Sequence, residues 1–280
     1  MADLIMGNTE LTASKQALIA SLVQKELKFA AKLFPTVTDL SSYCGKGMKS
    51  ISIPNLSSFT VVNRASGVQG DSSNLTAGVD LLTLDYNAYV AWIVDSSDEI
   101  QSTIDVQMAN AQRAAAALGR YVDTQIISKL DSVAGLDIGA APLTSALILD
   151  AREYLLNSFA NPQECNMLIG PDQEKVILQI SDFVRADAYG ASNIGSGIIG
   201  RIWGLNVMVH QGVAAGKAYF YDKSGIACAF QKQPSMSEQG ANQYGSGSKR
   251  VAVDQLFGVA GLQIAQNGAA AGKSPLVAKM

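Results

Sequence analysis

Histidine and cysteine are scarce in this sequence, and their scarcity limits the chemistry it can carry. His210 is the only histidine, and the three cysteines, Cys44, Cys165 and Cys228, lie far apart. No spacing typical of a zinc site or a disulfide framework is present, so we expect no metal and only buried or incidental thiols. One histidine leaves one place for a general base, and no G-x-S-x-G motif occurs. The sequence therefore predicts neither an enzyme nor a cofactor.

Basic excess and long apolar runs are also missing. Lysine and arginine number 21 against 24 aspartates and glutamates, a formal net charge of −3, whereas nucleic-acid-binding domains usually carry a basic patch. The longest apolar run, residues 88–94, is far shorter than the ~20 residues of a bilayer-spanning helix. Residues 1–8 lack the basic and apolar regions of a signal peptide. We expect no membrane contact and a cytoplasmic protein.

Charge of either sign is sparse. Charged residues make up 16% of the chain, against about 25% in a typical soluble domain. Apolar residues make up 48% of it, enough for a sizeable core. A surface with so few charges suits a protein that its neighbours largely cover, so the composition indicates assembly.

The first part of the chain predicts a helix followed by a long hairpin. Apolar residues recur near helical spacing over residues 11–34, and Pro35 ends that segment. Residues 49–53 alternate as in a strand that stops at Pro54, and residues 82–94 give a second strand pattern. The polar stretch between them, residues 55–78, predicts an extended loop. Loops of this length inside a domain are uncommon and usually functional.

A long capped helix follows this loop. Ser96 and Glu99 form a capping box, in which each side chain satisfies an otherwise unpaired backbone amide. Apolar residues then continue at helical spacing from Ile100 to Leu130. Gly119 in the middle permits a slight bend. We predict one spine helix over residues 96–131.

The second half of the chain alternates between helical and strand patterns. Residues 134–142 form a linker rich in glycine, alanine and proline. Helices are predicted over residues 143–159 and from Pro171 to about residue 180, since proline suits the first turn of a helix. Residues 235–248 predict a polar loop, and the residues after 264 predict a tail. The predicted strands cover residues 166–169, 205–210, 218–221, 249–253 and 256–264.

Two glycine-rich segments match nucleotide-binding motifs without their structural context. Gly195, Gly197 and Gly200 fit G-x-G-x-x-G, but no strand pattern precedes them and a strand pattern, not a helix, follows. Residues 268–274 are one residue short of a P-loop, and no helix follows to hold a phosphate. We therefore predict that the first segment leads into a β-hairpin and that the second belongs to a C-terminal tail.

The order and lengths of these elements resemble the major capsid protein of tailed double-stranded DNA bacteriophages, the Hong Kong 97 fold. The resemblance rests on the strand–loop–strand excursion, the capped spine helix, the glycine-rich segment and the terminal strand pair. It implies an α+β fold with an N-terminal arm (residues 1–38) and a peripheral domain (39–137). The peripheral domain would contain the extended loop (50–90) and the spine helix. An axial domain (138–245) and return strands with a C-terminal tail (246–280) would complete the chain.

The resemblance also implies a function without catalysis. The chain would assemble with itself into hexamers and pentamers of an icosahedral head that encloses double-stranded DNA without reading its sequence. Portal, scaffolding and decoration proteins would be its other partners, in a virion assembled in the host cytoplasm. The extended loop would carry the contacts between subunits, and the residues we assign to them are Phe59, Val61, Arg64, Gln69, Asp71 and Asn74.

Two alternatives remain open at this stage. The first is an encapsulin-like cellular nanocompartment shell, which would share the same fold and would differ by a cargo-docking pocket. The second is a soluble α/β protein that binds a nucleotide through Gly195, Gly197 and Gly200.

Overall fold

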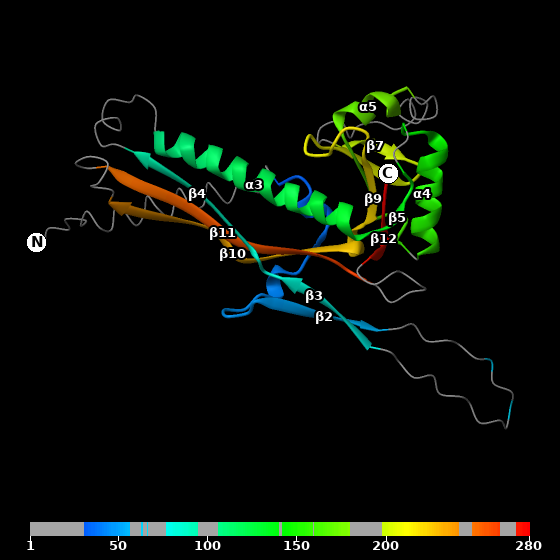
Figure 1. Cartoon of the computed structure of the whole chain (residues 1–280), viewed down its shortest axis with the longest axis horizontal. Helices are drawn as coiled ribbons and strands as arrows, with labels where there is room; N and C mark the ends of the chain where they lie inside the picture. Colours follow the sequence, from blue (N-terminus) through cyan, green and yellow to red (C-terminus); the bar gives the residue numbers. More distant parts are fainter. Residues whose placement is uncertain are drawn as a thin grey trace, which may run out of the picture.

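The spine helix α3 (Val106–Val133) runs along a long four-stranded sheet in the computed structural model (Figure 1). The structure describes residues 31–56, 63, 66, 77–94, 106–139, 142–158, 160–179, 198–240, 248–263 and 273–280. Most of the predicted N-terminal helix and the capping box of Ser96 and Glu99 lie outside these ranges. The predicted spine helix is confirmed over its described part, and it ends two residues beyond the predicted end.

Helical spacing of small and branched side chains places one face of α3 on the sheet. Ala111, Ala115 and Leu118 are buried and form a cluster with Val253 of the sheet. Further along the helix, Val122, Ile126 and Leu130 are buried in a larger cluster that contains residues from both sheets of the molecule. Burial of this apolar face, rather than helix propensity, stabilises a helix of this kind.

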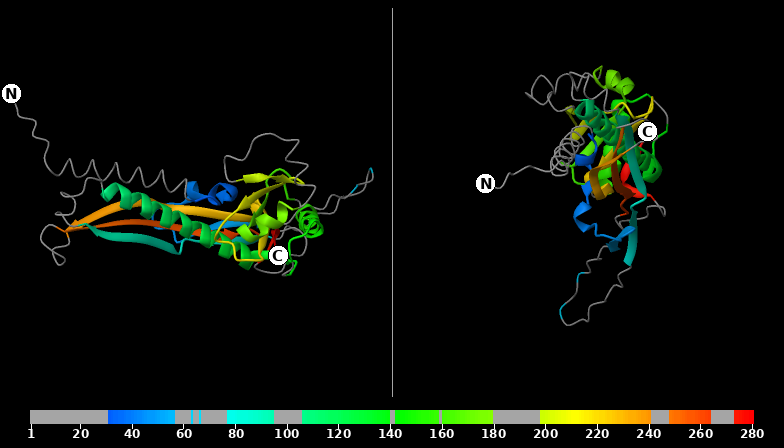
Figure 2. Two further views of the ribbon diagram at one scale, coloured as in Figure 1. Left: turned by 90° about the horizontal axis from the view of Figure 1, so that it is seen from above. Right: turned by 90° about the vertical axis from the view of Figure 1, so that its left-hand side faces the viewer.

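The four-stranded sheet has the order β1-β10-β11-β4. Its strands are β1 (Thr38–Asp39), β10 (Ile226–Gly240), β11 (Lys249–Gly261) and β4 (Tyr86–Val94). β10 pairs antiparallel with β11, from Ile226 opposite Gly261 to Gly240 opposite Lys249, and β11 pairs antiparallel with β4. Seen from above, α3 follows the length of these strands (Figure 2).

Two predictions for this sheet were wrong. Residues 235–240 of the expected loop over 235–248 are strand, because β10 continues through its serines and glutamines to Gly240. Ser235 and Ser237 stand opposite Asp254 and Ala252, so the polar residues occupy the face away from α3. The two strands predicted on either side of Asp254 are one strand, β11.

The predicted extended hairpin is confirmed, with different ends. β2 (Ser50–Leu56) pairs antiparallel with β3 (Ala77–Thr83) in a two-stranded sheet. Pro54 does not stop the strand, since it pairs opposite Val79; proline is tolerated at the free edge of a ribbon. The strand predicted over residues 82–94 is two strands, because the chain passes from the hairpin to the four-stranded sheet between β3 and β4.

A second, six-stranded sheet lies at one end of the molecule, with the order β5-β12-β9-β6-β8-β7. Its strands are β5 (Ala134–Asp137), β12 (Ser274–Lys279), β9 (Ala218–Asp222), β6 (Cys165–Ile169), β8 (Leu205–Val209) and β7 (Ile198–Ile202). The helices α4 (Ser145–Asn157) and α5 (Pro171–Ile177) belong to this half. Thr144 caps α4 by accepting a hydrogen bond from the Leu147 amide.

Two segments predicted as unstructured are strands of this sheet. Residues 134–137 of the expected linker form β5, and residues 274–279 of the expected tail form β12. β12 lies between β5 and β9, and Leu276, Val277 and Ala278 are buried. The run of three apolar residues from Leu276 to Ala278 is too short to identify as a strand from periodicity.

The glycine-rich segment leads into a hairpin, as predicted, rather than into a nucleotide-binding helix. β7 pairs antiparallel with β8, and Trp203 and Gly204 form the turn with φ of 44° and 84°. Two successive positive φ angles are typical of a two-residue type I′ hairpin turn. Gly195 and Gly197 lie outside the described residues. Short 3₁₀ helices complete the fold at Phe34–Thr36 (η1), Ser41–Tyr43 (η2) and Lys223–Gly225 (η4).

Candidate functional site

The β2–β3 hairpin is attached to the molecule by its inner face. Ile51 and Leu82 are buried, and with Leu84 they pack on small side chains of β10 and β11, namely Ala227, Ala229 and Ala260. These alanines face away from α3, so the hairpin lies on the opposite side of the four-stranded sheet from the spine helix (Figure 1).

A polar contact also holds the hairpin in place. The Asp80 carboxylate accepts a hydrogen bond of 2.7 Å from the backbone amide of Gln263, just after β11. Burial raises the pKa of the Asp80 carboxyl above its ordinary value, and this hydrogen bond opposes the shift. The base of the hairpin is therefore fixed by both apolar and polar contacts.

The outer face of the hairpin is apolar and exposed. Val79 and Leu81 are 65% and 54% exposed, and Pro54 stands opposite Val79 on β2. Large apolar side chains on one face of a ribbon that projects from the molecule are typical of a contact surface. We call Pro54, Val79 and Leu81 the hairpin patch.

Exposed apolar side chains also line the edge strand β4 on the side of the four-stranded sheet that faces away from α3, whereas Arg250 and Asp254 of β11 stand beside them. On β4, Tyr89 and Ile93 are 65% and 45% exposed, and Ala91 between them is exposed. Their neighbours Val90 and Trp92 pack toward α3 instead. The hairpin base covers one end of this sheet face, whereas Tyr89, Ala91 and Ile93 at the other end have no cover from the part of the chain that the structure describes. We call these three residues the open sheet face.

The loop residues predicted to contact other subunits cannot be placed. Phe59, Val61, Arg64, Gln69, Asp71 and Asn74 all lie outside the described residues. Of the loop between β2 and β3, only Asn63 and Ser66 are described, and both are exposed. The assignment of those six residues stays a prediction.

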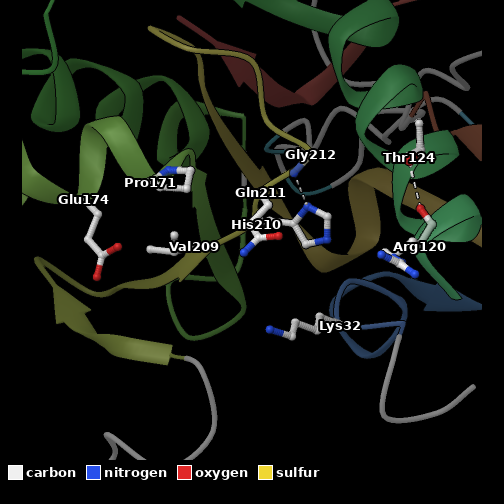
Figure 3. Close-up of a pocket in the computed structure, with 9 residues that line it drawn as sticks. All are labelled: Lys32, Arg120, Thr124, Pro171, Glu174, Val209, His210, Gln211 and Gly212. Atoms are coloured by element: carbon white, nitrogen blue, oxygen red, sulfur yellow. Dashed lines mark hydrogen bonds between the residues drawn. The ribbon is translucent and has the colours of Figure 1, made fainter. Parts of the chain in front are cut away.

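A groove lies where α3, the start of α5 and the end of β8 meet (Figure 3). Its volume is about 570 Å³, and its lining includes Lys32, Arg120, Glu174 and His210. Arg120 donates from Nε to the carbonyl of Ala116 at 3.2 Å. The groove is open to solvent along its exposed residues and holds no cluster of metal-ligating side chains among those described.

A buried carboxylate lies directly behind this groove. Asp123 of α3 has 0% exposure. Its Oδ1 accepts a hydrogen bond from the Leu33 amide at 3.1 Å and its Oδ2 accepts one from the Lys32 amide at 3.0 Å. The same Oδ2 lies 3.1 Å from Nε2 of His210, which follows β8. Three elements far apart in the sequence therefore meet at one side chain.

The fold does not activate the cysteines, since the pKa of each thiol is raised. Burial raises the pKa of Cys165 to about 11 and that of Cys228 to about 12, and it also raises the pKa of the partly exposed Cys44. A reactive cysteine needs a lowered pKa. No helix among the described residues is long and apolar enough to cross a membrane.

The surfaces found here differ from those predicted. Residues 88–94 are an unbroken apolar run, so no alternation in the sequence separates the exposed Tyr89 and Ile93 from their inward-facing neighbours. The period of two appears only in the burial of β4. Val79 and Leu81 lie between the predicted polar loop, residues 55–78, and the predicted strand, residues 82–94, so neither prediction included them. No sequence signal pairs Asp123 with His210, since 87 positions separate them.

Comparisons with known proteins agree with this architecture. A family model described as phage capsid protein matches residues 19–251. No curated protein matches. A solved structure of Mycobacterium phage Che8 is similar with a TM-score of 0.67 and 16% sequence identity, over 87% of this chain and 88% of that one. The capsid of cyanophage P-SCSP1u is similar with a TM-score of 0.65 and 12% sequence identity, over 87% of this chain and 85% of that one. A virus-like particle from Pyrococcus furiosus is similar with a TM-score of 0.65 and 9% sequence identity, over 95% of this chain and 99% of that one.

Proposed function

The chain belongs to the phage capsid protein family, and from this premise we propose how its subunits contact one another. It is a capsid shell protein of the virion with the α+β Hong Kong 97 fold, and its function is to assemble with itself. The finer organisation is our proposal: the chain forms hexamers and pentamers of an icosahedral head, and the β2–β3 hairpin is the main contact between neighbouring subunits.

The exposed apolar face of the hairpin is the observation that carries this proposal. Burying the Val79 and Leu81 side chains from 65% and 54% exposure on a neighbour would contribute roughly 1–2 kcal/mol each, at about 25 cal/mol per Å². Since a shell repeats each contact many times, even a small patch adds up over the assembly. Phe59, Val61, Arg64, Gln69, Asp71 and Asn74 would extend the contact beyond the patch.

The open sheet face is the surface we propose to receive the hairpin patch of a neighbour. Tyr89, Ala91 and Ile93 continue the sheet face on which the chain's own hairpin base packs. A neighbour's hairpin would complete the cover of that face. Such a head-to-tail contact uses two different surfaces, and it closes into a ring when the rotation between subunits allows it.

We retain the expected division into N-terminal arm, peripheral domain and axial domain as a proposal. Two strands support a change to its bounds. β10 lies within the expected axial domain, but it pairs with β11, which pairs with β4, and this supports placing it with the spine helix in the peripheral domain. β12 lies within the expected C-terminal tail, but its pairing with β5 and β9 supports placing it in the axial domain. The proposed shell holds double-stranded DNA without reading its sequence. Its other proposed partners are portal, scaffolding and decoration proteins. We further propose that it assembles in the host cytoplasm and that it has no catalytic role.

The experiment replaces the hairpin patch by charge. In the double variant Val79→Asp with Leu81→Asp, both new carboxylates lie on the outer face, so the subunit should stay folded while shell formation fails. Leu149→Asp on α4 is the matched control, since Leu149 is also an exposed leucine, at 44%. Circular dichroism measures folding and negative-stain electron microscopy counts particles. Normal shells from the double variant would contradict the proposed contact.

A further inference from the structure

We propose that Asp123 is a positioning residue of the shell subunit: its carboxylate sets how the six-stranded sheet is placed on α3. The inference rests on the proposed function, because the placement of the two halves sets the angle at which a subunit meets its neighbours. Asp123 belongs to α3, and its partners are the amides of Lys32 and Leu33 and the ring of His210, which follows β8 of the other sheet.

Apolar packing alone does not specify this placement. Val122 and Ile126 of α3 share one buried cluster with Met208 of β8 and Tyr219 of β9. Such clusters tolerate small shifts and changes of shape. Hydrogen bonds depend on distance and angle, and a buried carboxylate that loses its partners is strongly destabilising. A wrong placement of the six-stranded sheet on α3 therefore costs more free energy than the correct placement gains. A contact of this kind favours one arrangement of the two halves over the others.

The orientation of the His210 ring is fixed from both sides. The Gly212 amide donates a hydrogen bond to Nδ1 at 3.0 Å, so Nδ1 is an acceptor (Figure 3). In that tautomer Nε2 carries the proton and donates it to Asp123 at 3.1 Å. The imidazole thus acts as a rigid donor at the end of β8. The local hydrogen bond from Gly212 orients the ring, and the hydrogen bond to Asp123 then links the end of β8 to α3.

The last residues of the N-terminal arm reinforce the same junction. Leu33 and Val37 are each 1% exposed within the shared cluster. The Thr36 hydroxyl lies 2.7 Å from the phenol oxygen of Tyr221 in β9. Burial raises the pKa of that phenol above its ordinary value, the Thr36 hydrogen bond opposes the shift, and the charge of Asp123 adds to it. The segment therefore connects α3 through Asp123 with β9 through Tyr221.

Other charged groups around the junction do not replace this contact. Lys32 and Arg120 line the groove with exposed side chains, and Glu174 of α5 lines its far side. In the described structure none of them lies within ion-pair distance of Asp123, whose side-chain partner is the His210 ring. The positioning role thus belongs to Asp123 and His210, and it predicts specific consequences when either is changed.

The test measures placement in the unassembled full-length subunit. Spin labels at Ala117→Cys on α3 and Leu149→Cys on α4, both exposed positions, report the distance between the two halves in a Cys44→Ser background. His210→Leu should broaden the distance distribution, and His210→Asn, which keeps a donor for Asp123, should restore a narrow one. Val122→Ala is the control, since it weakens the same cluster without touching a hydrogen bond; it should lower the melting temperature and leave the distribution narrow.

The outcomes separate positioning from stability and from assembly. A narrow distribution in His210→Leu, or equal broadening in Val122→Ala, would overturn the inference. Electron microscopy of the same variants then measures particle diameters, which should spread in His210→Leu and stay uniform in His210→Asn. Wild-type protein that forms no shells would contradict the proposed function instead, and the spin-label result would still stand.

Discussion

The backbone of Gly258 in β11 lies against the backbone of Thr83 in β3. This close approach fixes the position of the hairpin on the four-stranded sheet. A Cβ added at Gly258 would collide with the Thr83 carbonyl oxygen and would lie 2.9 Å from Cδ2 of Leu82. A backbone carbonyl has little freedom to move away. Glycine at this position is therefore required by close approach and not by a positive φ angle.

Gly258→Ala should displace the β2–β3 hairpin from the four-stranded sheet. Overpacking of this kind costs about 1–3 kcal/mol, and the hairpin patch would be misdirected. Chemical denaturation should show the lower free energy of unfolding, and electron microscopy should show few closed shells. Gly240→Ala is the control, because a Cβ there meets nothing within 4 Å. Wild-type stability in Gly258→Ala would refute the close approach.

The C-terminal strand should be essential for the six-stranded sheet. Leu276 in β12 is 1% exposed, so Leu276→Ala should lower the free energy of unfolding by about 2–5 kcal/mol. Leu149→Ala is the same change at an exposed site and should cost far less. Thermal and urea unfolding of both variants measure the difference. Equal effects of the two substitutions would mean that β12 does not belong to the core.

The end of α3 should carry a pH-dependent contribution. Asp131 lies 2.9 Å from Nζ of Lys217, and this hydrogen bond is the main cause of its lowered pKa, which burial opposes and the charges of Lys217 and Lys279 assist. Because the folded-state pKa is below the unfolded one, the stabilisation is present at neutral pH and is lost as pH falls through the folded value.

Asp131→Asn should therefore lower the free energy of unfolding at pH 7 by about 0.2–1 kcal/mol, since the pair is partly exposed. The difference from wild type should begin to shrink below about pH 5 and should vanish only once the pH is below the folded-state pKa of Asp131. Lys217→Met should show the same pH profile. Urea unfolding at a series of pH values makes the comparison, and a difference that does not shrink at all as the pH falls from about 5 would exclude this ion pair as its source.

The strongly periodic parts of the sequence predicted the fold best. The spacing from Ile104 to Leu130 gave the spine helix, and the strand patterns around a polar stretch gave the hairpin. β10 was missed because its outward residues, such as Ser235 and Ser237, are polar and resemble a loop. β12 was missed because a short apolar run has no periodicity to measure.

The contact surfaces were only partly predictable. The polar loop correctly directed attention to the hairpin, but the exposed apolar residues Val79 and Leu81 are visible only once the register of β2 and β3 is known. The junction of Asp123 and His210 depends on tertiary packing of α3, β8 and the segment before η1. Local sequence carries no information about such a contact.

The most direct test of the account removes the loop that β2 and β3 carry. Leu56 pairs opposite Ala77, so residues 57–76 can be replaced by the two-residue turn Asn-Gly, which suits a tight hairpin. Circular dichroism and thermal melting should match the wild type, because the described core lies in α3 and the two large sheets. Electron microscopy should then find isolated capsomers and no closed shells. Wild-type numbers of normal shells from the trimmed chain would contradict the central claim that the extended hairpin joins the subunits.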